Sequence, residues 1–598
     1  MKTQLLRLFL FLCFIYCSTS PIKAQCGMFP LSIDERINEA SIIVEGKIIQ
    51  SNSYWDAKKE HIYTAHQLEI YKLFKGTYSQ STIYAVTDGG TVGNKRQTVS
   101  SAPILSLDDI GLFMVKSTHE QLIGITDEVF HIIAGAQGVI KYDLEAQQAN
   151  DVFHVYPNIS NDLYPAIQKT TQTKYTIIKP FLFTSLNNNT TSKTTAAIIS
   201  SFSPSTITAG TRTKLTINGS GFGATQGSGK IGFKNADDGG NSYVTAFAPN
   251  EPITWSDTKI EVLVPYRAAT GNIQVTPNGG AAATSSSTLM ITYAQQNYTD
   301  GSSKVYQADH VNSNNKGGYT WQFGPSFYNS TTTVMDAFKR AFQTWRCSTK
   351  VNWEIGANTT VDVVKSDGIN VICYSSSLPS GILAACTGYA SSCATGVWYI
   401  DEFDIAFTTN IATGYSWNYG VGNPASNQVD FETNCLHELG HGHQLGHVTN
   451  KADVMYYGVG AGVTKRNLTN NDLAGGNYIM GQSVVANSCG PGAMSALTGN
   501  VPCNTNVSLN EVLLESELTI FPNPTNGFIK IIFPDGITKA QLHITTVCGQ
   551  VIYSDTINEE TTHHLFKEID LSSVESGIYF ISVSSEKGIL NKKIMIQR

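Results

Sequence analysis

Four histidines and a glutamate stand together in one short stretch, HELGHGHQLGH, which runs from His437 to His447. On an α-helix, His437 and His441 are four residues apart and lie about 40° apart around the axis, so both imidazoles can bind one metal ion. Glu438 then projects beside the metal, where a carboxylate can take a proton from water. A catalytic zinc keeps three protein ligands and one open position, so a third ligand is expected from elsewhere in the chain.

His447 is the leading candidate for that third ligand. His443 lies six residues after His437, which is roughly 240° around the axis, so it points away from the metal while the helix continues. We expect His443 to support the ligands or to lie on the surface.

A glutamate on a second helix is the other kind of third ligand. No glutamate occurs between Glu438 and Glu511, so this kind is nearly excluded. To deliver His447, the helix must end after about two turns and the chain must swing back. Gly442 or Gly446 is expected to take the backbone conformations that such a turn needs.

Together these residues resemble the signature HExxHxxGxxH of the metzincin zinc metalloproteases, in which a methionine-containing turn follows the third histidine. The residues on its chemical positions are His437, Glu438, His441 and His447. Gln444 stands where the signature has glycine, and a non-glycine residue in a left-handed turn costs about 1 kcal/mol. The turn can therefore differ in shape, although no ligand is lost.

The stretch DVMYY, from Asp453 to Tyr457, is similar to the methionine turn of that family. The resemblance implies that Met455 packs beneath the metal without binding it. Tyr457 matches a tyrosine that reaches the zinc or stabilises the oxyanion in some subfamilies. A buried aromatic residue is the alternative interpretation of Tyr457.

The resemblance extends over residues 300–490, most closely toward the matrixin-like branch. Residues 361–364 and 397–407 have the pattern of strands, and residues 466–475 resemble the start of the family's last helix. One face of an earlier helix is marked by Val334, Met335, Ala337, Phe338, Ala341, Phe342 and Trp345. An α+β metzincin catalytic domain is implied.

The implied reaction is peptide-bond hydrolysis in a protein or peptide substrate, with Zn²⁺ as the catalytic metal. Glu438 would remove a proton from water and pass it to the leaving amine. The family holds an extended peptide antiparallel to an edge strand, so residues 397–407 or their neighbours would supply main-chain hydrogen bonds. Asp401, Glu402 and Asp404 are able to bind a structural Ca²⁺, although a solvated acidic strand is the favoured interpretation.

Residues 1–25 have the pattern of a signal peptide, in which Lys2 and Arg7 precede an apolar run. That run is too short to span a membrane, and no other long one occurs, so we expect no transmembrane segment. The pair Cys26-Gly27 is similar to the segment whose cysteine caps zinc in some metzincin proenzymes. A disulfide or a free thiol at Cys26 is the favoured alternative.

Residues 515–598 form a distinct C-terminal module. They open with LTIFPNPTNG, from Leu518 to Gly527, and continue as alternating segments to residue 596. This pattern resembles the C-terminal sorting domain of the Bacteroidetes type IX secretion system. The resemblance implies the type IX machinery as a partner and an extracellular or cell-surface location. An ordinary β-sandwich binding module is the alternative.

Two more β-rich modules precede the catalytic region. Residues 198–293 alternate in the manner of half-buried strands and resemble an immunoglobulin-like domain of the IPT/TIG type, for which a spacer role is expected. Residues 26–183 have strand patterns at 42–49 and 68–76 and are compatible with a small barrel of obscure role. Linkers are expected at 184–197 and 491–514.

The expected fold class is therefore a multidomain chain. An α+β metzincin catalytic domain is flanked by all-β modules, namely a β-rich N-terminal domain, an immunoglobulin-like sandwich and a C-terminal β-sandwich. The length of 598 residues fits about four domains. The net charge of −7 gives no basic surface for nucleic acid, so no nucleic-acid partner is expected.

Cysteine content agrees with an exported protein. Six cysteines fall within the catalytic region and predict up to three disulfides, although their pairing is open. These residues are Cys347, Cys373, Cys386, Cys393, Cys435 and Cys489.

Two functions follow from the sequence. The first is a secreted zinc endopeptidase with Glu438 as general base. The alternative is a surface adhesin or polymer-binding protein whose zinc-binding fold is catalytically silent. The complete ligand set beside Glu438 favours the enzyme, because a binding module has no physical need for a general base.

Overall fold

The computed structural model divides into two compact units, Met1–Gly499 and Asn500–Arg598, which are described separately. The expected signal peptide, Cys26, Cys489 and most of the two expected linkers lie outside the described residues. These are 27–181, 196–246, 253–299, 304–393, 396–458, 460–485, 490–498, 518–533, 539–546, 550–558, 566–585 and 588–598.

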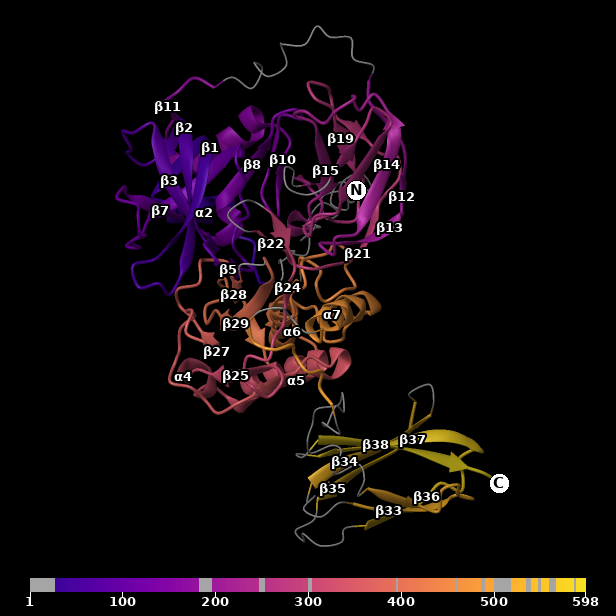
Figure 1. Cartoon of the computed structure of the whole chain (residues 1–598). Helices are drawn as coiled ribbons and strands as arrows, with labels where there is room; N and C mark the ends of the chain where they lie inside the picture. The colour runs from indigo at the N-terminus through magenta and orange to yellow at the C-terminus, as the bar shows by residue number, and fades with distance from the viewer. Residues whose placement is uncertain are drawn as a thin grey trace, which may run out of the picture. The chain divides into compact units, whose positions relative to one another are not determined.

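The N-terminal region contains a closed β-barrel, coloured indigo to purple in Figure 1. The order β1-β2-β3-β7-β6 returns to β1, because β1 pairs with both β2 and β6. Alternation along β1 gives the strand two apolar faces, since Val44 and Ile48 pack into one apolar cluster while Ile43 packs into another. The elements are α2 (Ile33–Glu39), β1 (Ile42–Trp55), β2 (Ile62–Lys75), β3 (Thr82–Asp88), β6 (Ile110–Ser117), β7 (Val129–Ile132), η1 (Gly135–Gly138), β8 (Val139–Asp143), β9 (Gln148–Asn150), β10 (Val155–Tyr156), η2 (Ile159–Leu163), α3 (Tyr164–Thr171) and β11 (Thr176–Ile177).

Residues 198–294 form an immunoglobulin-like sandwich. One sheet has the order β12-β14-β18-β17 and the other has β16-β15-β19-β20, while β13 pairs in parallel with β21. Leu215 and Ile260 from the first sheet and Phe233 from the second are fully buried in one core. The elements are β12 (Ile198–Ser203), β13 (Thr206–Ala209), β14 (Lys214–Ser220), β15 (Lys230–Lys234), η4 (Ala236–Asp238), β16 (Tyr243–Thr245), β17 (Thr254–Trp255), β18 (Lys259–Leu263), β19 (Gln274–Thr276), β20 (Ala283–Thr284) and β21 (Met290–Ala294).

The central region combines helices with a mostly parallel sheet. The sheet order is β26-β25-β27-β29-β28-β5-β4, and β24 pairs with β29. The elements are β22 (Tyr298–Thr299), β23 (Val305–Tyr306), β24 (Ala308–Asp309), β25 (Tyr319–Phe323), α4 (Pro325–Tyr328), α5 (Thr332–Thr349), β26 (Trp353–Ile355), β27 (Asn370–Tyr374), β28 (Ala384–Ser392), β29 (Trp398–Phe407), β30 (Ser416–Asn418), β31 (Gln428–Asp430), α6 (Phe431–Gly442) and α7 (Asn470–Ser483), with β4 (Gly90–Val92) and β5 (Lys95–Val99) from the N-terminal region.

The expected fold class, with an α+β metzincin catalytic domain between all-β modules, is wrong. The chain is mostly β, with 42% of residues in strands and 15% in helices. The central region is also not self-contained, because β4 and β5 of the N-terminal region extend its sheet. A linear pattern of strands and helices cannot show that a hairpin joins a sheet almost 300 residues further along.

Helix α5 shows why the apolar periodicity was informative. The predicted face is buried at Val334, Ala337, Phe338, Ala341, Phe342 and Trp345, whereas Met335 is only partly buried. The Trp345 indole donates a hydrogen bond of 2.7 Å to the carbonyl oxygen of Leu436 and so ties α5 to α6. The strand expected at 361–364 is absent, because those residues form a loop.

The described cysteines of the central region include both disulfide-bonded residues and free thiols. Cys347 and Cys393 are disulfide-bonded, whereas Cys373, Cys386 and Cys435 are buried free thiols. Three of the six cysteines therefore serve as apolar core residues, so the expected upper limit of three disulfides among the six is not reached.

The second unit has its own core. Its sheets have the orders β32-β33-β36 and β35-β34-β37-β38, and both contribute to one apolar cluster that includes Ile531, Leu542 and Ile581. The strands are β32 (Thr519–Phe521), β33 (Phe528–Ile532), β34 (Lys539–Thr546), β35 (Val551–Asn558), β36 (Phe566–Asp570), β37 (Gly577–Ser585) and β38 (Gly588–Ile596). Within the described ranges of the whole chain, no helix is long and apolar enough to cross a membrane.

Candidate metal centre

Helix α6 carries the first two histidines, and Asp430 fixes its start. The Asp430 carboxylate accepts hydrogen bonds from the Thr433 backbone N–H at 3.0 Å and from the Thr433 hydroxyl at 2.6 Å. A carboxylate at this end also complements the positive end of the helix dipole. Arg466 binds the same carboxylate through Nε at 3.0 Å and joins the segment before α7 to α6.

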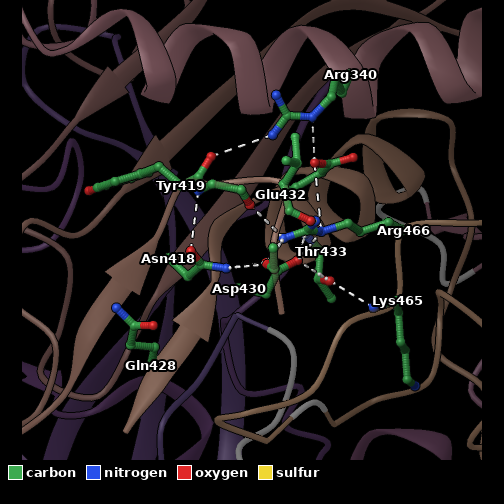
Figure 2. A network of polar contacts seen from close by, with 12 residues as sticks. Arg340, Asn418, Tyr419, Gln428, Asp430, Glu432, Thr433, Lys465 and Arg466 are labelled. Atoms are coloured by element: carbon green, nitrogen blue, oxygen red, sulfur yellow. Dashed lines mark hydrogen bonds and ion pairs between the residues drawn. The ribbon is translucent and has the colours of Figure 1, made fainter. Parts of the chain in front are cut away.

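Figure 2 shows how the surrounding polar network continues. Glu432, in the first turn of α6, accepts a hydrogen bond of 2.7 Å from Arg340 Nε on α5. The Lys465 backbone N–H donates to the Thr433 hydroxyl at 2.8 Å. Because these partners come from α5, α6 and the segment before α7, the network sets the position of the helix that presents the histidines.

Helix α6 ends after Gly442, and Gln444 makes the turn. Gln444 has φ of 64°, whereas neither Gly442 nor Gly446 has a positive φ, so the expectation that a glycine takes the unusual conformation is wrong. The Gln444 N–H donates to His441 O at 2.8 Å, and its carbonyl oxygen accepts from Gln296 N at 2.8 Å. The segment after β21 thus holds the turn that delivers His447, which offsets the cost of about 1 kcal/mol for a non-glycine residue there.

The structure brings the three predicted ligands together. One ligand atom from each of His437, His441 and His447 lies within 4.8 Å of the others, and all three residues are buried. In the described part of the chain, their Nε2 atoms have no hydrogen-bond partner. Three orphaned imidazole nitrogens that converge on one point are costly unless they bind a cation.

The second nitrogen of each ring explains why Nε2 is available. His437 Nδ1–H donates to Val454 O and His441 Nδ1–H donates to Leu445 O, each at 2.9 Å. A carbonyl oxygen only accepts, so Nδ1 carries the proton and Nε2 keeps its lone pair. Burial lowers the pKa of His441 to about 3, which favours the neutral ring that a metal requires. These residues fit a tetrahedral metal with one open position.

His447 is oriented by a residue from the immunoglobulin-like sandwich. Its Nδ1 lies 2.9 Å from Asp237 Oδ1, and Arg267 Nε lies 2.5 Å from Asp237 Oδ2. Burial would raise the pKa of Asp237, but Arg267 and then His447 hold it well below its ordinary value. A carboxylate that binds the far nitrogen of a ligand histidine fixes the ring and raises its basicity. The sandwich therefore contributes a residue to the candidate metal centre.

Glu438 is buried beside the ligands. Its Oε2 accepts hydrogen bonds from the Ser100 hydroxyl at 2.9 Å and from Cys386 N–H at 3.0 Å. Burial raises the pKa of Glu438 to about 7, although the Ser100 hydrogen bond, His447 and Cys386 N–H each oppose that rise. A carboxyl group with this pKa can both accept and donate a proton near neutral pH.

The methionine turn lies against α6. A Cβ atom on Gly440 would collide with Met455 Sδ, so the missing side chain of this glycine makes room for a buried Met455. The Tyr457 hydroxyl lies where a Cβ of Gly239 would stand, which places this tyrosine against the loop after η4. Burial raises the pKa of the Tyr457 phenol well above its ordinary value.

His443 is a core residue and not a surface one. Its Nε2 lies 3.1 Å from the Thr349 hydroxyl, and its Nδ1 lies 3.1 Å from His310 Nε2. Burial lowers the pKa of both histidines, His310 to about 3. The pair joins α6 to the segment around β24 and α5.

The acidic residues of β29 anchor a loop. Asp404 accepts backbone hydrogen bonds from Val371 at 2.8 Å and from Lys365 at 3.0 Å. Glu402 accepts one from Gly368 at 2.6 Å. These carboxylates are buried, so the expectation of a solvated acidic strand is wrong for them. Their oxygens accept hydrogen bonds from backbone N–H groups of the chain that follows residues 361–364, where a strand was expected.

The expected peptide-binding edge is covered. Strand β29 is an interior strand between β27 and β28, so it presents no free edge. The side of β28 that faces away from β29 pairs antiparallel with β5, from Lys95 opposite Ser391 to Val99 opposite Thr387. Ser100 continues this pairing, since its N–H donates to Cys386 O at 3.0 Å.

Sequence reasoning missed Asp237, Ser100 and Asp472. The Asp472 carboxylate caps α7 and accepts from Val454 N at 3.0 Å and Met455 N at 3.3 Å, which supports the methionine turn. The pattern Thr469-x-x-Asp472 is a capping-box signal that can be recognised in the sequence. Asp237 and Ser100 had no local signal, because their partners are 210 and 338 residues away.

Comparison with known families supports two modules. Residues 519–597 match the secretion system C-terminal sorting domain, and residues 197–293 match the IPT/TIG domain. The chain therefore carries a type IX sorting domain, which indicates the type IX secretion machinery as its partner and a secreted or cell-surface location in Bacteroidetes. The comparison with curated proteins found no match.

Two solved structures show weak overall similarity. The tetra-tandem repeat in the extending region of a large adhesion protein has 10% identity, 93% coverage of this chain and 92% of that chain, and a TM-score of 0.11. The BSP domain of a biofilm-associated protein has 8% identity, 93% and 81% coverage, and a TM-score of 0.13. Such scores do not establish a shared fold.

Proposed function

We propose that this secreted protein is a zinc-dependent endopeptidase. The observation that carries the proposal is the convergence of three buried, partnerless Nε2 atoms from His437, His441 and His447 beside the Glu438 carboxylate. Neither matched family covers residues 300–490, so the proposal depends on this geometry.

The residues of the chain divide the chemistry between them. The three imidazoles would hold Zn²⁺, and a bound zinc ion supplies Lewis-acid polarisation of a substrate carbonyl and acidifies water. Glu438 accepts the proton of the attacking water and passes it to the leaving amine. Strand β28 lies beside Glu438, because Cys386 N–H donates to its carboxylate. The main chain of β28 can align an extended peptide once the edge that faces β5 is free.

The test compares zinc content with hydrolysis. We expect the full chain to bind one zinc ion, Glu438→Gln to retain it, and His447→Ala to lose most of it. Hydrolysis of unfolded casein, measured before and after limited proteolysis of the chain, should fall at least about 100-fold in Glu438→Gln. Zinc binding without hydrolysis in either state of the parent would contradict an endopeptidase.

A surface adhesin with a silent zinc site is the second candidate. The observation that favours it is the covered edge of β28, together with the hydrogen bonds that Ser100 and Cys386 make to Glu438. The two solved structures described above come from adhesion and biofilm proteins, but their TM-scores carry no weight. Binding of a surface polymer by both the parent and Glu438→Gln, with no hydrolysis by either, would select this candidate.

A further inference from the structure

Two segments of the N-terminal region lie along one edge of the central sheet. Residues 95–100 pair antiparallel with residues 391 to 386 of β28. Residues 27–29 pair with residues 383 to 381, since Leu383 N–H donates to Gly27 O at 2.6 Å and Phe29 N–H donates to Gly381 O at 2.5 Å. Met28 forms an antiparallel bridge with Ile382.

Both segments run in the same direction along this edge. Residues 95–100 and then residues 27–29 together follow the path of one extended peptide, with an interruption between Ser100, opposite Cys386, and Gly27, beside Leu383 and Ala384. Glu438 lies at the interruption, because its Oε2 accepts from Ser100 Oγ and Cys386 N–H while its Oε1 lies 2.8 Å from the position of a Gly27 Cβ. The chain thus fills both halves of a peptide path that flanks the general base.

Side chains hold the first segment in place. Lys95 Nζ lies 2.5 Å from the Ser391 hydroxyl and 3.3 Å from Asp401 Oδ2. Arg96 donates to the Thr299 hydroxyl at 2.9 Å. A substrate must therefore replace main-chain hydrogen bonds and several side-chain contacts to reach the same edge.

A cavity of about 780 Å³ reaches the histidines that are predicted to bind the metal. His441, His447 and Asp237 line it on one side, and Arg96, Ser100 and Arg267 also line it. Water and metal ions can reach the histidines through this cavity, whereas the edge of β28 that a peptide would use is already paired with β5.

We propose that residues 27–29 and 95–100 make the N-terminal region an internal inhibitor of the metal centre. This inference rests on the proposed endopeptidase function. A substrate can pair with β28 only after these two segments leave its edge, so hydrolysis would be restricted until they are displaced. The apparent affinity for a peptide falls in proportion to the fraction of molecules that are open.

Two substitutions in the full chain open the path at separate points. Thr98→Pro removes a main-chain donor opposite Gly388. Gly27→Ala places a Cβ against Glu438 and Ala384 O at a residue whose φ is 77°. Ser79→Pro, in an exposed loop of the same region, is the matched control. Zinc content and circular dichroism establish that each variant is folded and loaded.

The measurements are casein hydrolysis and binding of a fluorescent trialanine hydroxamate by anisotropy. We expect Thr98→Pro and Gly27→Ala to bind the probe, and to hydrolyse casein, at least about tenfold better than the parent, with Ser79→Pro equal to the parent. Equal probe binding by the parent and both variants would overturn the inhibitor, since peptides would then enter through the cavity.

The remaining outcomes separate the inhibitor from the enzyme. Tighter probe binding by the variants without hydrolysis by any protein would support the inhibitor and contradict the endopeptidase. If only one variant folds with zinc, that variant decides the result. Loss of zinc from both would show that the segments are structural parts of the metal centre and would overturn the inhibitor.

Discussion

At the scale of single residues, Asp237 has the clearest indirect role. Its carboxylate binds His447 Nδ1, so Asp237→Ala should free the ring and weaken zinc binding by about 10- to 100-fold. Asp237→Asn keeps one acceptor oxygen and should give a smaller loss. Competition with a chromogenic zinc chelator measures the effect, and Glu261→Ala, which breaks exposed ion pairs in the same sandwich, is the control. Unchanged affinity in Asp237→Ala would show that His447 needs no support.

The buried side chain of His66 should make the stability of the folded chain depend on pH. It is buried between the Ser51 and Thr87 hydroxyls, and burial lowers its pKa to about 4. Between pH 6.5 and about 4, the unfolded chain therefore binds more protons than the folded chain. The free energy of unfolding decreases as the pH falls through that window. At pH 5 the loss is about 2 kcal/mol.

The matched variant is His66→Gln, which keeps a polar side chain but does not titrate. Thermal unfolding of the full chain at pH 7.5 and pH 5 should show a smaller pH effect in this variant than in the parent. Zinc loss in acid affects both proteins alike, so the difference between them belongs to His66. The same pH effect in both proteins would contradict the assignment.

At the scale of elements, the start of α7 supports the segment that orients His437 of the candidate metal centre. Asp472 accepts backbone hydrogen bonds from Val454, Met455 and Thr469, and Val454 O accepts from His437 Nδ1. Asp472→Ala leaves buried N–H groups without partners and should destabilise the first unit by about 3 kcal/mol. Asp472→Asn should cost less. Urea unfolding measures stability, and hydrogen exchange at residues 453–457 should rise; slow exchange there would argue against this coupling.

At the scale of the whole molecule, the candidate metal centre and the sorting domain belong to different units. The sorting domain has its own core, and the metal ligands all lie in Met1–Gly499. Deletion of residues 519–597 should therefore retain the protein inside the cell envelope while leaving its zinc content and thermal unfolding unchanged. Fractionation of a Bacteroidetes host with zinc analysis tests both parts. A lower zinc content after deletion would show that the units depend on each other.

The sequence by itself determined the local features, because these depend on spacing along the chain. The four-residue interval between His437 and His441, the apolar face of α5 and the alternating C-terminal strands all follow from helix and strand periodicity. The residue at the turn was less readable, since Gln444 adopts a left-handed conformation that Gln296 supports through a distant hydrogen bond.

Only the tertiary structure decided which distant segments meet. Asp237 reaches His447 from the sandwich, and β5 reaches β28 from the N-terminal region. Neither contact leaves a periodic signal, because pairing between far segments depends on how whole modules pack and not on local spacing. For the same physical reason, the sequence pointed to the three histidines that the structure brings together, but it could not show that the chain itself occupies the strand edge beside them.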